Sequence, residues 1–263
     1  MFNTPILYII FNRLDTVKQT FPKIKEQKPK QLFIAADGPR KDRIGEAEKC
    51  LEVRNWVMKE IDWVCDVHTL FRDENLGCGK AVSSAITWFF NNVEQGIILE
   101  DDCLPAESFF MYCEELLNYY KSNKKIMHIT GDNPLTITPK DKNSYYYSYI
   151  QHCWGWASWK DRWEKYQFII DKYCIDILNT HPYFKSKSVQ NYWQNIFLDK
   201  EIPTHTWDYQ WTYSILKNNG ICVNPCHNQI TNIGFTSDST HFSNCDNSLF
   251  SRKSFEIRTI RHP

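Results

Sequence analysis

Short apolar runs alternate with longer amphipathic segments through the first hundred residues of the chain. Runs of this length bounded by turn residues are typical of buried strands, and apolar residues at helical spacing are typical of helices. The expected strands are residues 5–11, 31–36, 66–71 and 96–99, and the expected helices are residues 15–26, 46–59 and 79–92. This alternation predicts βαβ units and therefore a mostly parallel α/β sheet flanked by helices.

Polar residues follow each of these four runs, and they are expected to meet at one edge of the sheet. Right-handed crossovers place the carboxyl ends of parallel strands on one side, where α/β sheets bind ligands. The polar ends are Asn12 with Arg13, Asp37 with Gly38, residues 75–77, and residues 100–102. This edge is the predicted ligand site.

Three adjacent acids, Glu100, Asp101 and Asp102, end the fourth run. Neighbouring carboxylates repel one another unless a cation joins them, and a divalent cation with oxygen ligands is the simplest candidate. Glu100 would orient the group, and Asp101 would lie near a ribose or the metal. The alternative is an acidic turn exposed to solvent.

The chain has neither a glycine-rich dinucleotide fingerprint nor a P-loop. A nucleotide would therefore be bound by individual side chains at the sheet edge. Asp37 is placed to accept a hydrogen bond from a base or ribose, although Asp-Gly is also a common turn pair. Arg13, Arg40 and Lys80 are candidates to neutralise phosphate.

The second half of the chain is rich in aromatic residues, and seven of its tryptophans lie between Trp154 and Trp211. Core packing explains most aromatic side chains, and a sugar-stacking surface is the alternative. We expect one domain over residues 1–263, with a nucleotide-sugar half at 1–104 and an acceptor half at 105–263. In the acceptor half we expect helices at 107–122, 159–166, 171–178, 186–198 and 207–218, strands at 125–130, 145–149, 151–158 and 221–224, and irregular chain from 225 onward.

Charge and cysteine content limit the classes of partner. The 31 basic and 31 acidic residues balance, which argues against a nucleic-acid partner. Local lysine excess between residues 18 and 30 could give weak peripheral membrane contact, or could be a solvated helix face.

The ten scattered cysteines contain no CxxC pair, so we expect free thiols and a cytoplasmic location. No signal peptide or membrane span is expected.

The order of the motifs resembles the nucleotide-diphospho-sugar transferases of GT-A fold, most closely the N-acetylglucosaminyltransferase I type and its bacterial relatives. Asn12 with Arg13 resembles their nucleotide loop, and Asp37 their base-binding acid. The other matching segments are the acidic (DXD-type) metal motif at 100–102, residues 131–133, Gly155 with Trp156, residues 207–211, residues 222–225 and 232–234, and His241. Tyr209 departs from the pattern, because the family has a second acid there.

The resemblance implies a GT-A glycosyltransferase that uses Mn²⁺ or Mg²⁺ and a nucleoside-diphosphate sugar, with UDP favoured. It implies that Asp102 and His241 hold the metal and that Asp132 and Trp156 line the sugar site. It also implies that Asp208 is the general base. From the residues alone, Asp208 could be a first-turn helix acid, Asp132 could cap a turn, and His241 could be an exposed loop residue.

The expected reaction is inverting transfer of a hexosyl or N-acetylhexosaminyl group to a hydroxyl of a glycan acceptor, in surface polysaccharide synthesis. Metal and cations would neutralise the leaving diphosphate, and a carboxylate on the other face would take the acceptor proton. One alternative is a non-catalytic carbohydrate-binding module that uses the tryptophan cluster. A nucleotidyltransferase is less favoured, because the loop after the first strand lacks glycine.

Overall fold

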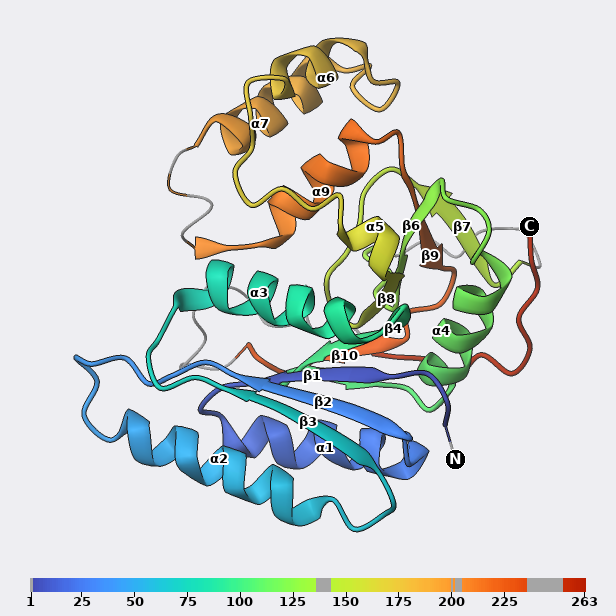
Figure 1. The fold of residues 1–263 in the computed structure, drawn as a ribbon. Coiled ribbons are helices and arrows are strands. Elements are labelled where there is room, and N and C mark those ends of the chain that lie inside the picture. The colour runs from blue at the N-terminus through green and yellow to red at the C-terminus, as the bar shows by residue number, and fades with distance from the viewer. Residues whose placement is uncertain (1, 136–142, 200, 202–204, 236–252) are drawn as a thin grey trace.

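The computed structural model describes residues 2–135, 143–199, 201, 205–235 and 253–263. In this part of the chain a central sheet has the strand order β3-β2-β1-β4-β8-β6-β9-β7 (Figure 1). Its strands are β1 Ile6–Ile10, β2 Gln31–Ala36, β3 Asp66–Phe71, β4 Gln95–Glu100, β6 Ile126–Thr130, β7 Tyr145–Ser148, β8 Trp156–Trp159 and β9 Ile221–Pro225.

The first four strands are parallel to one another. β1 lies between β2 and β4, with Ile6 opposite both Leu32 and Ile97, and β2 pairs in parallel with β3. β8 runs antiparallel to β4 and β6, while β6 and β9 are parallel. The predicted mostly parallel α/β sheet is therefore confirmed, and β2 and β3 agree with their predicted bounds.

Helices cover both faces of the sheet (Figure 1). They are α1 Leu14–Gln27, α2 Glu46–Glu60, α3 Gly77–Asn92, α4 Ser108–Tyr119, α5 Lys160–Trp163, α6 Cys174–Thr180, α7 Lys187–Leu198 and α9 Asp208–Lys217. Alternate residues of β1 point to opposite faces. Tyr8 packs in a core with α1, α2 and α4, whereas Leu7 packs in a core with α3, α5 and α9.

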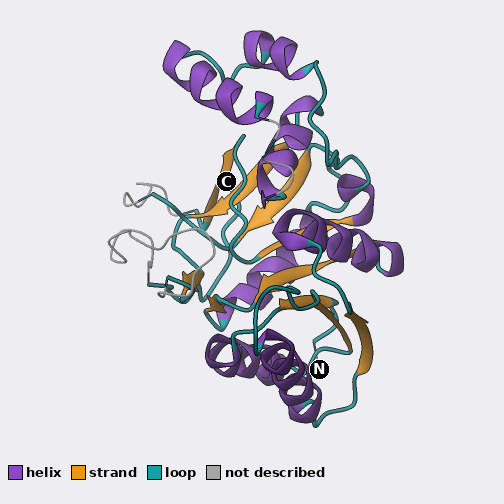
Figure 2. Ribbon diagram, turned by 90° about the vertical axis from the view of Figure 1, so that its left-hand side faces the viewer, coloured by secondary structure: helices purple, strands orange, loops and turns teal. Residues whose placement is uncertain are grey.

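A third apolar cluster joins α6, α7 and α9 beside the sheet. Its buried members include Trp193, Phe197, Tyr213 and Leu216. In Figure 2 these helices lie at the top, the strands in the middle, and α1 and α2 at the bottom. We call the group α6, α7 and α9 the helical lobe.

Two short strands were not predicted. β5 (Cys103–Pro105) and β10 (Ile230–Asn232) pair antiparallel, with Asn232 opposite Cys103. Three-residue strands carry too little pattern to be detected, and β10 lies in the segment expected to be irregular. The strand expected at 151–158 is also shorter, because Gly155 adopts a positive φ of 57° just before β8 begins.

The cysteines of the described residues are free thiols, as predicted. Within the same residues no helix is both long enough and apolar enough to cross a bilayer.

Candidate functional site

A cleft of about 1130 Å³ lies at the carboxyl ends of β1, β2 and β4. The side chains that line it include Asn12, Arg13, Asp37, Asn75, Glu100 and Asp101. The polar strand ends therefore meet at one edge, as the βαβ pattern predicts. His205, from the chain just before α9, also lines the cleft.

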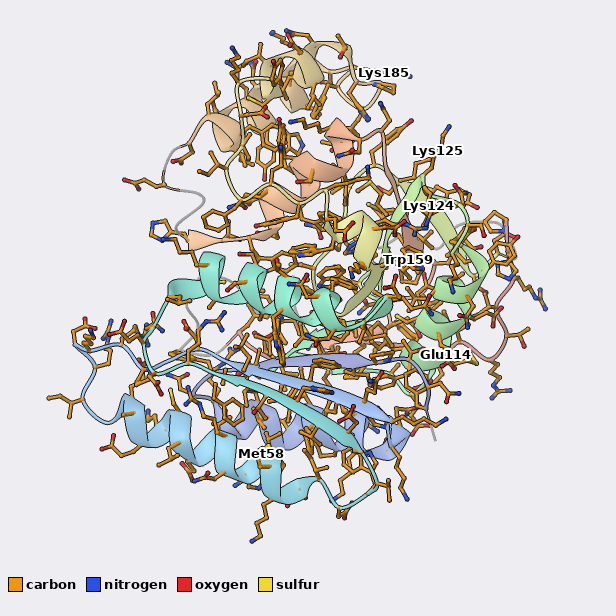
Figure 3. The ribbon with its side chains drawn as sticks, viewed as in Figure 1. Met58, Glu114, Lys124, Lys125, Trp159 and Lys185 are labelled. Atoms are coloured by element: carbon orange, nitrogen blue, oxygen red, sulfur yellow. The ribbon has the colours of Figure 1, made fainter. Side chains whose placement is uncertain are left out.

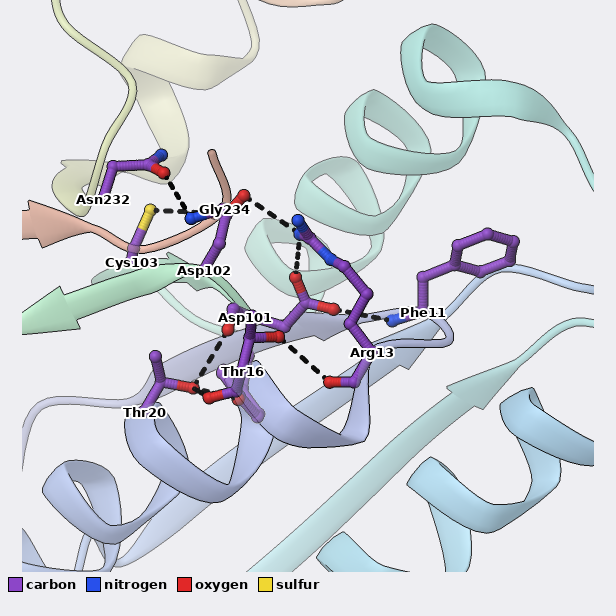
Figure 4. Close-up of polar contacts among 10 residues, drawn as sticks. Phe11, Arg13, Thr16, Thr20, Asp101, Asp102, Cys103, Asn232 and Gly234 are labelled. Atoms are coloured by element: carbon purple, nitrogen blue, oxygen red, sulfur yellow. Dashed lines mark hydrogen bonds and ion pairs between the residues drawn. The ribbon is translucent and has the colours of Figure 1, made fainter. Parts of the chain in front are cut away.

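Arg13 lies between the carboxylates of Asp101 and Asp102 (Figure 4). Its Nη2 donates to Asp101 and to Oδ2 of Asp102, the latter over 3.0 Å. Asp101 also accepts the backbone N–H of Phe11 at 3.2 Å, and its carbonyl accepts from Oγ1 of Thr20 at 3.2 Å. Asp101, with a 5% exposed side chain, thus ties the loop after β1 to the end of β4, whereas Asp102 is 20% exposed.

Negative charge exceeds positive charge at the end of β4. Burial, and then the charges of Asp102 and Asp101, raise the pKa of Glu100 to about 8. Burial also raises the pKa of Asp101 to about 6, although Arg13 opposes this rise. Burial opposes the charge of Arg13, but the two aspartates hold its pKa above the ordinary value. One guanidinium faces three carboxyl groups, so the site favours an additional cation.

The donor atoms here are suited to a hard divalent cation. Oδ1 of Asp102 is contacted by Sγ of Cys103 at 3.6 Å, while Oδ2 is bound by Arg13. Within the described residues, no three His, Cys, Asp or Glu side chains are grouped to hold a metal. Mg²⁺-type sites commonly use one or two carboxylates and complete the shell with substrate phosphate and water. The residues fit a metal of that kind, and His241 lies outside the described residues.

The chain just after β10 packs against Asp102 (Figure 4). The N–H of Ile233 donates to the carbonyl of Asp102 at 2.9 Å, and the N–H of Gly234 donates to Oδ1 of Asn232 at 2.8 Å. A Cβ at position 234 would lie 2.9 Å from Cβ and Cγ of Asp102. Glycine is therefore required here for the carboxylate to keep its position.

Asp37 connects two strand ends. Its carboxylate accepts the backbone N–H groups of Gly38 at 3.0 Å, Leu76 at 3.0 Å and Gly77 at 3.1 Å. Burial raises the pKa of Asp37, and these three N–H groups oppose the rise. Asp37 lines the cleft. Its carboxylate oxygens already accept these three backbone N–H groups, and the bonds stabilise the turn.

Asn12 and Arg40 are held by Glu46, an acid that the sequence reasoning missed. Glu46 accepts from Nδ2 of Asn12 at 3.0 Å and from the backbone N–H of Arg40 at 2.7 Å, and its carboxylate pairs with the Arg40 guanidinium. The only sequence signal for this role is an acid in the first turn of an expected helix. Lys80, in contrast, is exposed and does not line the cleft.

Asp208 is the first residue of α9, and Oγ1 of Thr206 donates to its carboxylate. Burial, and then the charges of Glu100 and Asp208, raise the pKa of Cys78 to about 12. Asp208 also contributes to the raised pKa of Glu100. Asp208 therefore lies within electrostatic reach of the acids at the end of β4, although the two segments are far apart in sequence.

The tryptophans form core rather than surface. Trp156 has no exposed surface, and its ring stacks on His128 (4.9 Å between centroids) and on Trp207 (5.6 Å). The prediction that Trp156 lines a sugar pocket disagrees with this burial, because neither ring face is open. The other buried tryptophans of the cluster are Trp159, Trp163, Trp193, Trp207 and Trp211.

Figure 3 shows Trp159 in the interior, whereas Lys125 and Lys185 extend from the surface. Trp154 is half-buried against Phe235, at 5.7 Å between ring centroids.

Asp132 is buried after β6, and its backbone N–H donates to Oγ1 of Thr130 at 3.2 Å. Its charge contributes, after burial and the nearer acids, to the raised pKa of Cys153.

No family model and no curated protein sequence matches this chain. Among solved structures it is similar to S. aureus TarS, at 8% identity and a TM-score of 0.47 over 88% of this chain and 59% of that one. It is also similar to GalNAc-T7 with UDP, GalNAc and Mn²⁺, at 10% identity and a TM-score of 0.48 over 85% of this chain and 42% of that one. HddC from Yersinia pseudotuberculosis matches at 8% identity and a TM-score of 0.36, over 60% of this chain and 77% of that one. Similarity of this size does not assign a function.

Proposed function

We propose that this protein is an inverting, metal-dependent glycosyltransferase of GT-A fold. It would move a hexosyl or N-acetylhexosaminyl group from a nucleoside-diphosphate sugar, UDP-linked, to a hydroxyl of a glycan acceptor in surface polysaccharide synthesis. The observation that carries the proposal is the cleft at the carboxyl ends of β1, β2 and β4, where Arg13, Glu100 and Asp101 line one wall and His205, from the chain just before α9, reaches the same cleft. The order of sequence motifs supports the same assignment.

Donor binding is proposed for the half of the chain at 1–104. The cleft is large enough for a nucleotide, and Arg13 and Arg40 line it beside the acids. Arg13 would bind phosphate oxygens while it keeps Asp101 and Asp102 in place. A Mn²⁺ or Mg²⁺ ion held by Asp102, with Glu100 beside it, would neutralise charge on the leaving diphosphate.

The acceptor side is proposed for residues 105–263, with Asp208 as general base. The carboxylate would accept the proton of the acceptor hydroxyl as the new bond forms. Thr206 would orient the carboxylate of Asp208 through the hydrogen bond that its hydroxyl donates to it. Attack from the face opposite the leaving diphosphate inverts the anomeric carbon, and the protein contributes mainly by positioning the two substrates.

The two alternatives are less well supported. A carbohydrate-binding module built on the tryptophan cluster needs open indole faces, and six of the seven tryptophans between 154 and 211 are buried. A nucleotidyltransferase would need a glycine-rich loop after β1, and residues 11–14 contain no glycine. A nucleotidyltransferase would also release pyrophosphate from a nucleoside triphosphate, which the same assay can detect.

The test is nucleoside-diphosphate release from UDP-, GDP- and CDP-sugars with Mn²⁺ and a panel of p-nitrophenyl glycosides as acceptors. We expect UDP release that depends on Mn²⁺ and on acceptor. Asp102→Asn should lose Mn²⁺-dependent UDP binding, and Asp208→Asn should bind UDP but lose transfer. Asp176→Asn, an exposed acid of α6, is the matched control. Absence of release from every donor, or pyrophosphate release from a triphosphate, would reject the proposal.

A further inference from the structure

Glu46 joins two loops of the cleft through one carboxylate. It is the first residue of α2, and its side chain is only 6% exposed. Its Oε1 accepts from Nδ2 of Asn12 at 3.0 Å and also from Nη2 of Arg40. Asn12 lies in the loop after β1 and Arg40 in the loop after β2, and both side chains line the cleft. Because they share one acceptor atom, they are neighbours in the cleft wall.

The carboxylate of Glu46 determines which atom of the Asn12 amide remains for a ligand. An ionised carboxylate only accepts hydrogen bonds, so the amide must turn its NH2 group towards Glu46. The hydrogen bond from Arg40 lowers the pKa of Glu46 and outweighs the effect of burial, so the carboxylate is ionised at neutral pH. Within the described part of the chain no donor bonds to Oδ1 of Asn12. This oxygen is therefore available to accept from a ligand.

Arg40 is held as firmly as Asn12. Its Nε donates to both oxygens of Glu46, at 3.1 and 3.0 Å, and its backbone N–H donates to Oε2 at 2.7 Å. Its Cζ lies 5.7 Å from the centre of the Phe11 ring. Nη1 of Arg40 has no acceptor among the residues that the structure describes. Because Glu46 balances the charge of Arg40, the N–H groups of Nη1 suit a neutral carbonyl oxygen.

The cleft wall thus offers one fixed acceptor, Oδ1 of Asn12, and a neighbouring fixed donor, Nη1 of Arg40. Uracil has the complementary edge, because its N3–H donates and the adjacent carbonyl oxygen accepts. Cytosine has an unprotonated N3 beside an amino group, so acceptor would face acceptor and donor would face donor. Unpaired polar groups of this kind are how a binding site rejects the wrong ligand.

We propose that Asn12 and Arg40, positioned by Glu46, bind the N–H and carbonyl edge of the donor's base and so select uracil over cytosine. The inference rests on the proposed function, since it concerns the nucleotide of the same sugar donor. It moves base recognition away from Asp37, whose two oxygens already accept backbone N–H groups. Guanine has the same edge at N1 and O6, and a measurement with GDP distinguishes it from uracil.

The experiment is isothermal titration of UDP, CDP and GDP, each with Mn²⁺, into wild type, Glu46→Gln, Asn12→Ala and Glu48→Gln. Wild type should bind UDP roughly tenfold more tightly than CDP. In Glu46→Gln the new amide can donate as well as accept, so Asn12 can turn over and the preference should disappear. Asn12→Ala should weaken UDP binding and leave CDP binding unchanged. Glu48→Gln is the matched control, because Glu48 is an exposed acid in the same helical turn and does not line the cleft.

The ratio of UDP to CDP affinity separates recognition of the base from a general loss of structure, which would weaken both nucleotides alike. Equal affinities in wild type, an unchanged ratio in Asn12→Ala, or an equal change in Glu48→Gln rejects the inference. The glycosyltransferase still stands in those cases if UDP is released in the transfer assay. Tighter binding of GDP than of UDP supports the same edge with guanine as the base and contradicts the UDP donor. If no nucleoside diphosphate binds, the proposed function and this inference both fall.

Discussion

Trp211 donates its indole N–H to Nδ1 of His128 over 3.1 Å, and this hydrogen bond links α9 to strand β6 of the central sheet. The other ring nitrogen of His128 lies 3.0 Å from the carbonyl of His152. Together the two bonds require a neutral imidazole that carries its proton on Nε2. Because Trp211 is one turn along α9 from Asp208, the same bond fixes the helix that carries the candidate base.

Acid should weaken the fold through His128. Burial lowers its pKa from the ordinary 6.5 to about 3, so below pH 6.5 the unfolded chain binds a proton that the folded chain does not. The free energy of unfolding should therefore fall as the pH is lowered from about 6.5 to about 3, by up to about 1.4 kcal/mol per pH unit. Urea unfolding at a series of pH values measures this slope.

The comparison with His128→Gln isolates the contribution of His128. Other groups also titrate, and Glu100, whose pKa is raised, contributes a slope of opposite sign between about 4.5 and 8. The difference in unfolding free energy between wild type and variant removes those shared contributions. If this difference does not depend on pH, His128 is not the cause.

Gly234→Ala should weaken Mn²⁺-dependent UDP binding at least tenfold. The added Cβ would overlap the carboxylate of Asp102, which must then move away from Arg13. Isothermal titration with UDP and Mn²⁺ measures the loss. Gly220→Ala is the matched control, because its Cβ would meet Met127 in the core and should cost stability without changing UDP affinity. Equal UDP affinities for wild type and Gly234→Ala would contradict the role of Asp102.

Sequence reasoning recovered the parts of the fold that local patterns determine. β2 and β3 match their predicted bounds, and the convergence of Asn12, Asp37 and Glu100 follows from the handedness of βαβ units. The pairing of Asn232 with Cys103 was missed, because two three-residue strands have no pattern of their own and meet only in the folded chain.

The site was less predictable than the sheet, because contacts between distant residues determine it. A tryptophan looks the same in sequence whether its ring is open or stacked, and Trp156 proved to be enclosed by His128 and Trp207. Glu46 was overlooked because its partners, Asn12 and Arg40, lie in loops whose shape no periodicity encodes.

Arg13→Met should destabilise the protein by about 3 kcal/mol, because it leaves the buried carboxylate of Asp101 without its cation. Combining it with Asp101→Asn removes the uncompensated charge and should restore part of this loss. Urea unfolding at pH 7 gives the unfolding free energies of wild type, the two single variants and the double variant, which together form a double-mutant cycle. Additive losses in the double variant would mean that the two side chains are not energetically coupled.

Thr206→Val should lower kcat roughly tenfold while the KM of the sugar nucleotide stays unchanged. The hydroxyl of Thr206 donates to the carboxylate of Asp208, and valine has the same shape without that donor. Asp208 would then be less well oriented towards the acceptor hydroxyl, while the donor cleft keeps its residues. Thr206→Ser retains the hydroxyl and should rescue the rate. Steady-state kinetics with saturating acceptor measures both constants, and a loss in Thr206→Val that serine does not rescue would point to disturbed packing at the start of α9 instead.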